Sequence, residues 1–424
     1  MASTMNAHQS DTKLLFAARI TRLFAYGFVS VVLVLFLAET GLSGSGIGAI
    51  LTATLAGDIL VSLWITMIAD RVGRKNMLLL GSLLMVIAGL VFLVTSNPVW
   101  ITIAAIIGIV SPSGNEIGPF LSIEQAALSQ LVPDKRRTTV FGWYNLVGSF
   151  ATAAGALAGG WLAQVLQQSG LSALASYRYI MAGYAGCGVV LLLLFSMLSK
   201  DSEVSPVAES QKNGAARRYL GLHQSRKVVF KLSSLFALDA FAGGFVVQSM
   251  IAWWFHARYG IDEGMLGSIF FGANLLAGVS ALLATRIADR IGLVNTMVFT
   301  HIPSNILLCL VPLMPNLWSA ITVLLLRFSI SQMDVPTRQS YTMAVVNPDE
   351  RTAASGVTNV ARSVGAAVSP ALGGLLMADP VLFSASFIIA GGLKIVYDLC
   401  LYRMFQKIRP PEEPKQTLSL YSKN

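Results

Sequence analysis

Runs of about 20 mainly apolar residues recur along this chain, and a run of that length is what an α-helix needs to cross the hydrocarbon core of a bilayer. Polar or proline-containing breaks such as 43–46, 96–98 and 379–380 separate neighbouring runs. The pattern predicts an all-α integral membrane protein with twelve transmembrane helices. We place these helices at 16–39, 47–69, 76–96, 99–126, 138–160, 178–198, 232–256, 265–288, 294–314, 317–344, 352–377 and 381–404.

The composition excludes the main classes of soluble protein. Of the 424 residues, 54% are hydrophobic and only 12% are charged, whereas soluble domains carry about 25% charged residues. The three cysteines, Cys187, Cys309 and Cys400, lie inside apolar runs, and the four histidines are scattered. We therefore expect no disulfide framework, no metal site, no cofactor and no enzyme activity.

The excess of Lys and Arg that gives the chain its net charge of +9 is concentrated in certain connections between the predicted helices. The connections at 40–46, 97–98, 315–316 and 378–380 contain neither residue, while 71–75, 135–137 and 199–231 are rich in both. Because cytoplasmic loops carry the excess of Lys and Arg, we expect both termini and the loop 199–231 to be cytoplasmic. We expect the protein to lie in the cell membrane, either a plasma membrane or an inner membrane. The cytoplasmic loops account for the excess of basic residues, so no nucleic-acid partner is required.

The two halves of the chain repeat each other. The segment 69–73, Ala-Asp-Arg-Val-Gly, recurs at 288–292 as Ala-Asp-Arg-Ile-Gly. A constant offset of 214 residues then aligns Arg137 with Arg351 and Glu124 with Arg338. This repeat predicts two pseudo-symmetric six-helix bundles with a substrate path between them. The predicted units are an N-terminal segment at 1–15, bundles at 16–198 and 232–404, a central loop at 199–231 and a tail at 405–424.

A family resemblance rests on the segment 66–75, Thr-Met-Ile-Ala-Asp-Arg-Val-Gly-Arg-Lys. It resembles the G-x-L-A-D-R-x-G-R-K loop between the second and third helices of the major facilitator superfamily of secondary transporters. The resemblance implies that fold, alternating access, and a cytoplasmic gate with a weaker second copy. The implied gate residues are Asp70, Arg71, Gly73 and Arg74, then Asp289, Arg290 and Gly292. The segment 155–160, Gly-Ala-Leu-Ala-Gly-Gly, is similar to the G-P-x-x-G-G motif of drug:proton antiporters and favours export.

Charged residues within the predicted spans are the candidates for a substrate or proton path, because each costs about 2.5–3.5 kcal/mol near the bilayer centre. They are Asp58, Glu116, Glu124, Asp239, Asp334, Arg338 and Arg362. In the family fold, spans one, four, seven and ten line the path. We expect Pro112 and Pro119 to break span four beside Glu116.

Two pairings are predicted for charged residues in the spans, and a third contact is open. Asp58 and Arg362 are expected to pair between the halves. The topology accounts for Arg22 at the cytoplasmic end of span one, although it could also reach Glu124. Lys394 and Asp398, four residues apart on one predicted helix, are expected to pair locally or to extend toward the membrane surface.

We interpret the chain as a secondary active transporter that works by alternating access, with proton-coupled export of small organic molecules. Protonation of Asp58, Glu116, Glu124 or Asp239 would carry the coupling. A uniporter or a proton symporter of a small polar nutrient is the alternative within transport. A lipid flippase or a non-transporting membrane sensor is the alternative from another class. The expected partners are a small-molecule substrate, protons and the lipid bilayer, and the functional unit is expected to be a monomer.

Overall fold

A computed structural model of the chain describes residues 2–114, 119–132, 134–199, 222–347, 350–406 and 408, without the side chains of 2–9, 66, 67, 70, 71, 134–139, 285 and 352. Within these residues the regular structure is helical throughout. The first half contains α1 Ala2–Ser30, α2 Leu33–Glu39, α3 Gly44–Val72, α4 Arg74–Val94, α5 Pro98–Ile107, α6 Phe120–Leu131, α7 Asp134–Gln168 and α8 Ala173–Ser196. The second contains α10 Arg226–Gly244, α11 Gln248–Tyr259, α12 Glu263–Ile291, α13 Leu293–Leu310, η3 Val311–Leu313, α14 Leu317–Phe328, α15 Asp334–Ala344, α16 Arg351–Leu376 and α17 Pro380–Phe405.

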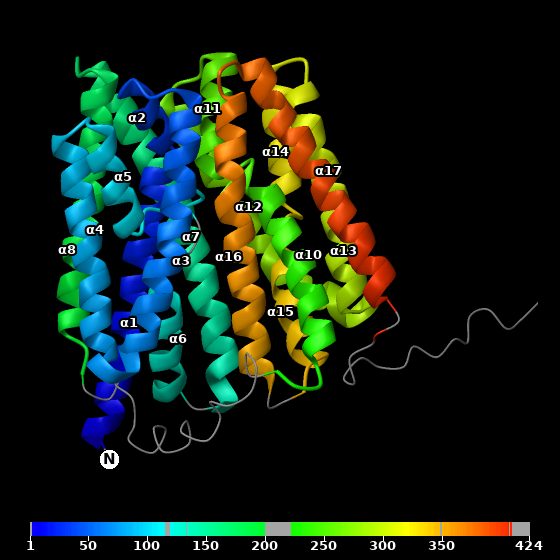
Figure 1. Cartoon of the computed structure of the whole chain (residues 1–424). Coiled ribbons are helices and arrows are strands. Elements are labelled where there is room, and N and C mark those ends of the chain that lie inside the picture. The colour runs from blue at the N-terminus through cyan, green and yellow to red at the C-terminus, as the bar shows by residue number, and fades with distance from the viewer. Residues whose placement is uncertain are drawn as a thin grey trace, which may run out of the picture.

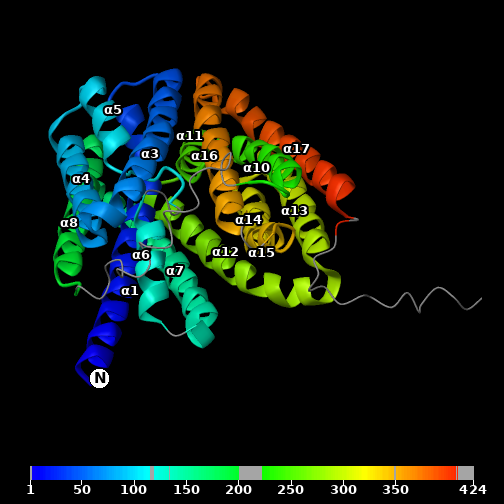
Figure 2. The same ribbon diagram turned by 60° about the horizontal axis from the view of Figure 1, so that its bottom comes forward.

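The helices form two groups that lie side by side, α1–α8 and α10–α17 (Figures 1 and 2). In the first group α1 packs against α7 and α8, and in the second α10 packs against α16 and α17. The turns at Gly73 and Gly292 lie at the end where α1 begins, which we call the basic end. The turns at Gly41 and Gly260 lie at the opposite end, which we call the far end.

Length and apolar composition qualify most of these helices to cross a membrane. Among the described residues, eight stretches pass this test alone, and α1 with α2 passes as a pair bent by 43°. Two shorter apolar helices, α5 and α14, form the first parts of the predicted fourth and tenth spans. The predicted eleventh span is α16, a helix of 26 residues that carries Arg362 in its middle.

Four predicted spans, the first, fourth, seventh and tenth, are each broken into two helices. The breaks follow Ser30, Ile107, Gly244 and Phe328. In the fourth span Ile109 and Gly114 adopt positive φ angles of 55° and 69°, which an α-helix cannot include. The predicted break of this span is therefore confirmed. Its freed carbonyl groups find partners elsewhere, because the Tyr184 hydroxyl donates to the oxygens of Gly108 and Ile109, each at 3.0 Å.

The two groups meet along α7–α12 and α3–α16. A methyl group added to Gly160 would lie 2.8 Å from the Cα of Gly267, and one added to Gly48 would lie 2.4 Å from the carbonyl oxygen of Pro370. Glycine is therefore required for the helices to approach this closely. The Trp161 indole also donates to Ser268 Oγ at 3.0 Å across the same seam. All of these contacts lie in the half of the molecule nearer the far end.

Candidate functional site

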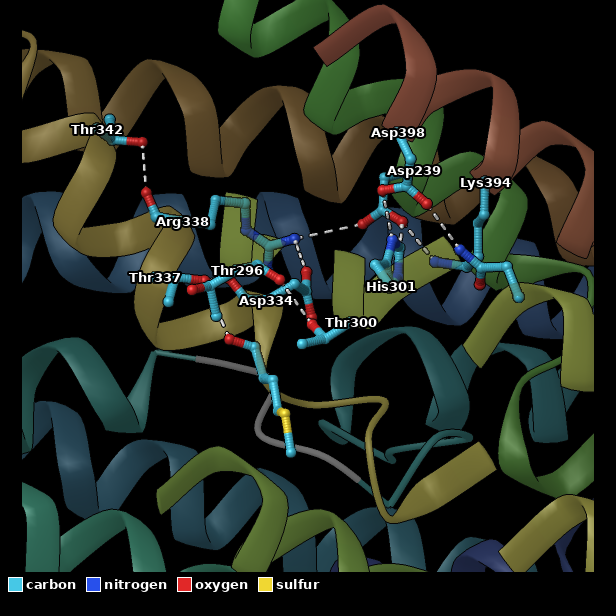
Figure 3. A network of polar contacts seen from close by, with 12 residues as sticks. Asp239, Thr296, Thr300, His301, Asp334, Thr337, Arg338, Thr342, Lys394 and Asp398 are labelled. Atoms are coloured by element: carbon cyan, nitrogen blue, oxygen red, sulfur yellow. Dashed lines mark hydrogen bonds and ion pairs between the residues drawn. The ribbon is translucent and has the colours of Figure 1, made fainter. Parts of the chain in front are cut away.

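The second helix group encloses an acid–base cluster around Asp239 of α10 (Figure 3). Asp239 accepts a hydrogen bond from Lys394 Nζ of α17 and one from Arg338 Nη1 of α15 at 3.3 Å. His301 Nε2 of α13 lies 3.9 Å from the same carboxylate. Asp239 is only 4% exposed, so Lys394 and Arg338 replace the water that an ionised carboxylate would otherwise require.

Two further carboxylates extend this cluster in opposite directions. Asp334, the first residue of α15, accepts from Arg338 Nη1 at 2.9 Å. On the other side, Asp398 Oδ1 of α17 lies 2.8 Å from His301 Nδ1, and its Oδ2 accepts from Asn305 Nδ2 at 3.0 Å. The imidazole of His301 therefore lies between the carboxylates of two different helices.

The cluster combines three carboxylates, two permanent or nearly permanent cations and one imidazole. Asp239, Asp334 and Asp398 face Arg338 and Lys394, and all five are buried. His301 can hold either one or two protons between its two carboxylate neighbours. Arg327 of α14 and Arg362 of α16 are close enough to Asp239 for electrostatic attraction. The cluster forms where the broken seventh and tenth spans face α13, α16 and α17.

The first helix group contains a smaller cluster around Glu124 of α6. Arg22 of α1 donates to both of its carboxylate oxygens, with Nη2 at 2.8 Å from Oε2. The Tyr144 hydroxyl of α7 donates to Oε2 as well. Both charged side chains are fully buried, and the guanidinium of Arg22 lies 4.8 Å from the centre of the Phe120 ring. Arg22 therefore does reach Glu124, the contact that the sequence left open.

An uncharged polar bridge joins the two groups near the helix breaks. Gln248 Nε2, at the start of α11, donates to Ser30 Oγ at 2.7 Å, and Gln248 Oε1 accepts from Asn274 Nδ2 at 3.1 Å. The Ser249 amide donates to the carbonyl oxygen of Pro112 at 3.1 Å. The interruptions of the first, fourth and seventh spans therefore meet at amide and hydroxyl groups.

The predicted path residues have different places in the structure. Asp239, Asp334 and Arg338 come together in one cluster. Glu116 lies outside the described residues. Asp58 accepts a hydrogen bond from Ser62 at 3.2 Å. Among the described contacts no ion pair joins Asp58 to Arg362 in this conformation, so that pair stays a prediction.

The predicted gate residues lie at the basic end. Gly73 and Gly292 have positive φ angles of 106° and 85°, which explains why both copies of the repeat carry glycine there. Arg74 Nη1 donates to Gln130 Oε1 at 2.7 Å. The Asp289 and Arg290 side chains are exposed. The side chains of Asp70 and Arg71 lie outside the described residues, so their gating role stays a prediction.

The prediction for Lys394 and Asp398 is wrong. The two residues do not pair with each other but bind Asp239 and His301 of other helices. The reason is that α17 packs against both α10 and α13, which places its polar face inside the group. The sequence contains a signal that sequence reasoning missed. His301 and Asn305 form a second polar pair four residues apart in an apolar run.

Comparisons with known proteins agree with this architecture. The model of the Major Facilitator Superfamily matches residues 15–369 and 234–420. The chain is 31% identical over 421 residues to the membrane protein YJR124C of Saccharomyces cerevisiae, covering 93% of this chain and 94% of the relative.

Among solved structures, a mutant of the nucleoside transporter NupG superposes with a TM-score of 0.74 at 13% identity, covering 93% of this chain and 100% of that one. A D-xylose–proton symporter gives 0.70 at 16% identity, covering 94% and 98%. A bacterial homologue of the human lysosomal transporter Spinster gives 0.71 at 15% identity, covering 94% and 97%. These likenesses confirm the predicted fold class.

Proposed function

Because the chain belongs to the Major Facilitator Superfamily, we propose that it is a proton-coupled secondary transporter of a small, uncharged polar solute that works by alternating access. The family and the structural likenesses identify a multi-pass membrane transporter rather than an enzyme. The coupling ion, the class of solute and the direction of transport are the proposed elements.

The observation that carries the proton coupling is the position of Asp239. Its carboxylate is shared by Lys394, Arg338 and His301, and these three side chains come from three other helices. A proton that arrives at the Asp239 carboxylate removes its charge and weakens the attraction between α10 and those helices. A proton that leaves restores it. Protonation is thereby linked to how α10 packs, and α10 continues through a break into α11, which contacts the opposite group through Gln248.

The uncharged bridge supports the proposed class of solute. Gln248, Ser30 and Asn274 are all buried and all neutral, and they offer both donors and acceptors. A hydroxyl- or amide-bearing solute could replace the bond between Gln248 and Ser30 without leaving a buried polar group unpaired. Among the described residues, the hydrogen bonds of this bridge involve no charged side chain.

Export is the proposed direction of transport. It is supported by the similarity of 155–160 to the antiporter motif, and Gly160 of that segment lies in the seam between the helix groups. Import by proton symport is the second candidate, favoured by the likeness to the D-xylose–proton symporter.

The proposed topology places the basic end in the cytoplasm, because that end carries the excess of Lys and Arg. The contacts of the seam near the far end then close the side opposite to the cytoplasm. The cell membrane, both termini in the cytoplasm and a functional monomer are part of this proposal.

The test has two stages. Purified protein is first screened by thermal shift against neutral and charged solutes, because a bound solute raises the unfolding temperature by mass action. The best solute is then followed in proteoliposomes under an imposed pH gradient. We expect wild-type protein to accumulate it, and Asp239→Asn to equilibrate it without accumulation. Solute moving against the proton flow supports export, and movement with it supports symport. Equal behaviour with and without the gradient contradicts proton coupling.

A further inference from the structure

The carboxylate of Glu263 accepts hydrogen bonds across the seam between the two helix groups. It lies at the far end, well away from the Asp239 cluster. Glu263 is the first residue of α12 and only 4% exposed. Its Oε1 accepts a hydrogen bond from the Tyr177 hydroxyl of α8 and another from Gln167 Nε2 of α7 at 3.0 Å. Both donors belong to the first helix group, so this one side chain joins the two halves where they close.

The other charged groups of this end do not neutralise Glu263. Asp262 is exposed and caps α12 through the Met265 amide. Glu39 adds negative charge near Tyr177. The cations and the histidine of the neighbouring helices have other contacts: Arg178 donates to Ser96, Arg258 lies over the rings of Trp254 and Tyr259, and His256 contacts the Ile261 carbonyl. Among the described residues, Glu263 is therefore held by two neutral donors and the N-terminus of its own helix.

We propose that Glu263 is the latch of the far-end gate, and that a proton taken from the far side releases it. An ionised carboxylate forms hydrogen bonds roughly twice as strong as those of a neutral acceptor. The proton adds to the free oxygen Oε2, the charge on Oε1 disappears, and both bonds across the seam weaken. The remaining seam contacts at Gly160 and Gly267 involve no ionised group and do not respond to pH.

The latch rests on the alternating access of the proposed function, but it assigns a separate task to a separate carboxylate. Glu263 would admit solute and protons from the far side, whereas Asp239 would couple proton movement to solute movement. A proton would bind first at the far end and only then reach the centre. The two tasks can be measured independently.

Distances between spin labels at Ser169 and Pro315 test the latch. Both positions are exposed at the far end, one in each half, and the labels require serine in place of the three cysteines. In nanodiscs we expect the wild-type population with long distances to grow as the pH falls through the range in which carboxyl groups ordinarily take up protons, from about 6 to about 3.5. Glu263→Gln should raise the open-to-closed ratio about tenfold at the higher pH and abolish its pH dependence.

Two variants serve as controls for this experiment. Asp262→Asn removes the same charge one residue away and keeps the helix cap, so it should match the wild type. Tyr177→Phe removes one donor but keeps the carboxylate, so it should open the gate partially and preserve the response to pH. A closed, pH-responsive population in Glu263→Gln overturns the latch.

The Asp239→Asn variant distinguishes a failure of the latch from a failure of the proposed coupling. Its far-end distances should still respond to pH through Glu263. If transport ignores an imposed pH gradient while the far end still opens through Glu263, the coupling is wrong and the latch stands. If Asp239→Asn removes the far-end response and Glu263→Gln does not, the latch is wrong.

Discussion

The two helix groups bury charges of opposite sign at equivalent positions. Glu124 and Arg338 occupy the same place in the repeat, 214 residues apart. Glu124 binds an arginine of the first span, Arg22, whereas Arg338 binds an aspartate of the seventh, Asp239. The same scaffold therefore carries an acid with a basic partner in one half and a base with an acidic partner in the other.

The two clusters also differ in how completely they are closed. Both oxygens of Glu124 bind the guanidinium of Arg22, and Tyr144 adds a further donor. Asp239 instead shares its partners with Asp334 and, through His301, with Asp398. A permanently ionised guanidinium fixes the first pair, while the imidazole of His301 gives the second cluster a group that can be neutral or protonated. Under the proposed function, we therefore expect the first cluster to serve stability and the second to serve proton exchange.

The largest effect is expected from breaking the first pair. Arg22→Met leaves Glu124 buried without a counter-ion, which costs about 3–5 kcal/mol. The unfolding temperature in detergent and the yield of folded protein should both fall sharply. The double variant Arg22→Met with Glu124→Met should recover most of the loss, because apolar side chains can replace a buried pair. A single variant as stable as wild type would refute the structural role of the pair.

The next effect concerns the imidazole of the second cluster. His301→Gln keeps a donor near Asp398 but removes the group that accepts a proton. We expect pH-driven accumulation in proteoliposomes to fall about tenfold, with the unfolding temperature little changed. Asp398→Asn should lower the accumulation by a similar factor. The double variant should lower it by less than the product of the two single factors, because the two residues act in one network. If the double variant instead shows the full product of the two single factors, His301 and Asp398 do not act together in transport.

A smaller effect on stability alone is expected at Tyr144. Tyr144→Phe removes one hydrogen bond to the Glu124 carboxylate and keeps the pair with Arg22. The cost should be about 1.5–3 kcal/mol of unfolding free energy, measured by denaturant or thermal unfolding. The pH profile of transport should match wild type, and a shifted profile would show that the first cluster also exchanges protons.

The smallest effect is local and concerns the turn before α16, where the repeat again reverses charge and aligns Glu350 with Arg136. Glu350 binds the amides of His223 and Ser225, the latter at 3.0 Å, just before α10 begins. Burial raises the pKa of this carboxyl, but the hydrogen bonds from His223 and Ser225 outweigh burial and lower its pKa to about 2.

A folded-state pKa below the usual value of 4.5 means that Glu350 stabilises the fold above that pH and loses this contribution as the pH falls toward about 2. Pepsin cleavage at the start of α10 should therefore rise across that interval in the wild type. Glu350→Gln should be cleaved readily throughout. Equal cleavage of both proteins at the upper end of the interval would contradict the role of Glu350.

Much of the fold could be predicted because it depends on local patterns. Apolar length and the offset of 214 residues indicate the spans and the repeat, and the cost of buried charge singles out Asp239, Asp334 and Arg338. The contacts of Lys394 with Asp239 and of Asp398 with His301 could not be predicted, because spacing within one helix does not say which helix it faces. Glu263 escaped notice for a related reason. It lies at a helix start, where an acidic residue is ordinary, and only packing makes it buried.

The glycine seam at Gly160, Gly267 and Gly48 affects the rate at which the two helix groups separate as well as how closely they pack. Backbone lies against backbone at these three positions, so no side chain has to change its rotamer at these points when the halves move apart. Separation at these points therefore carries little activation enthalpy from steric release. The lifetime of the closed state is then determined by a few polar contacts, and single substitutions at those contacts should change the turnover number rather than the affinity for solute.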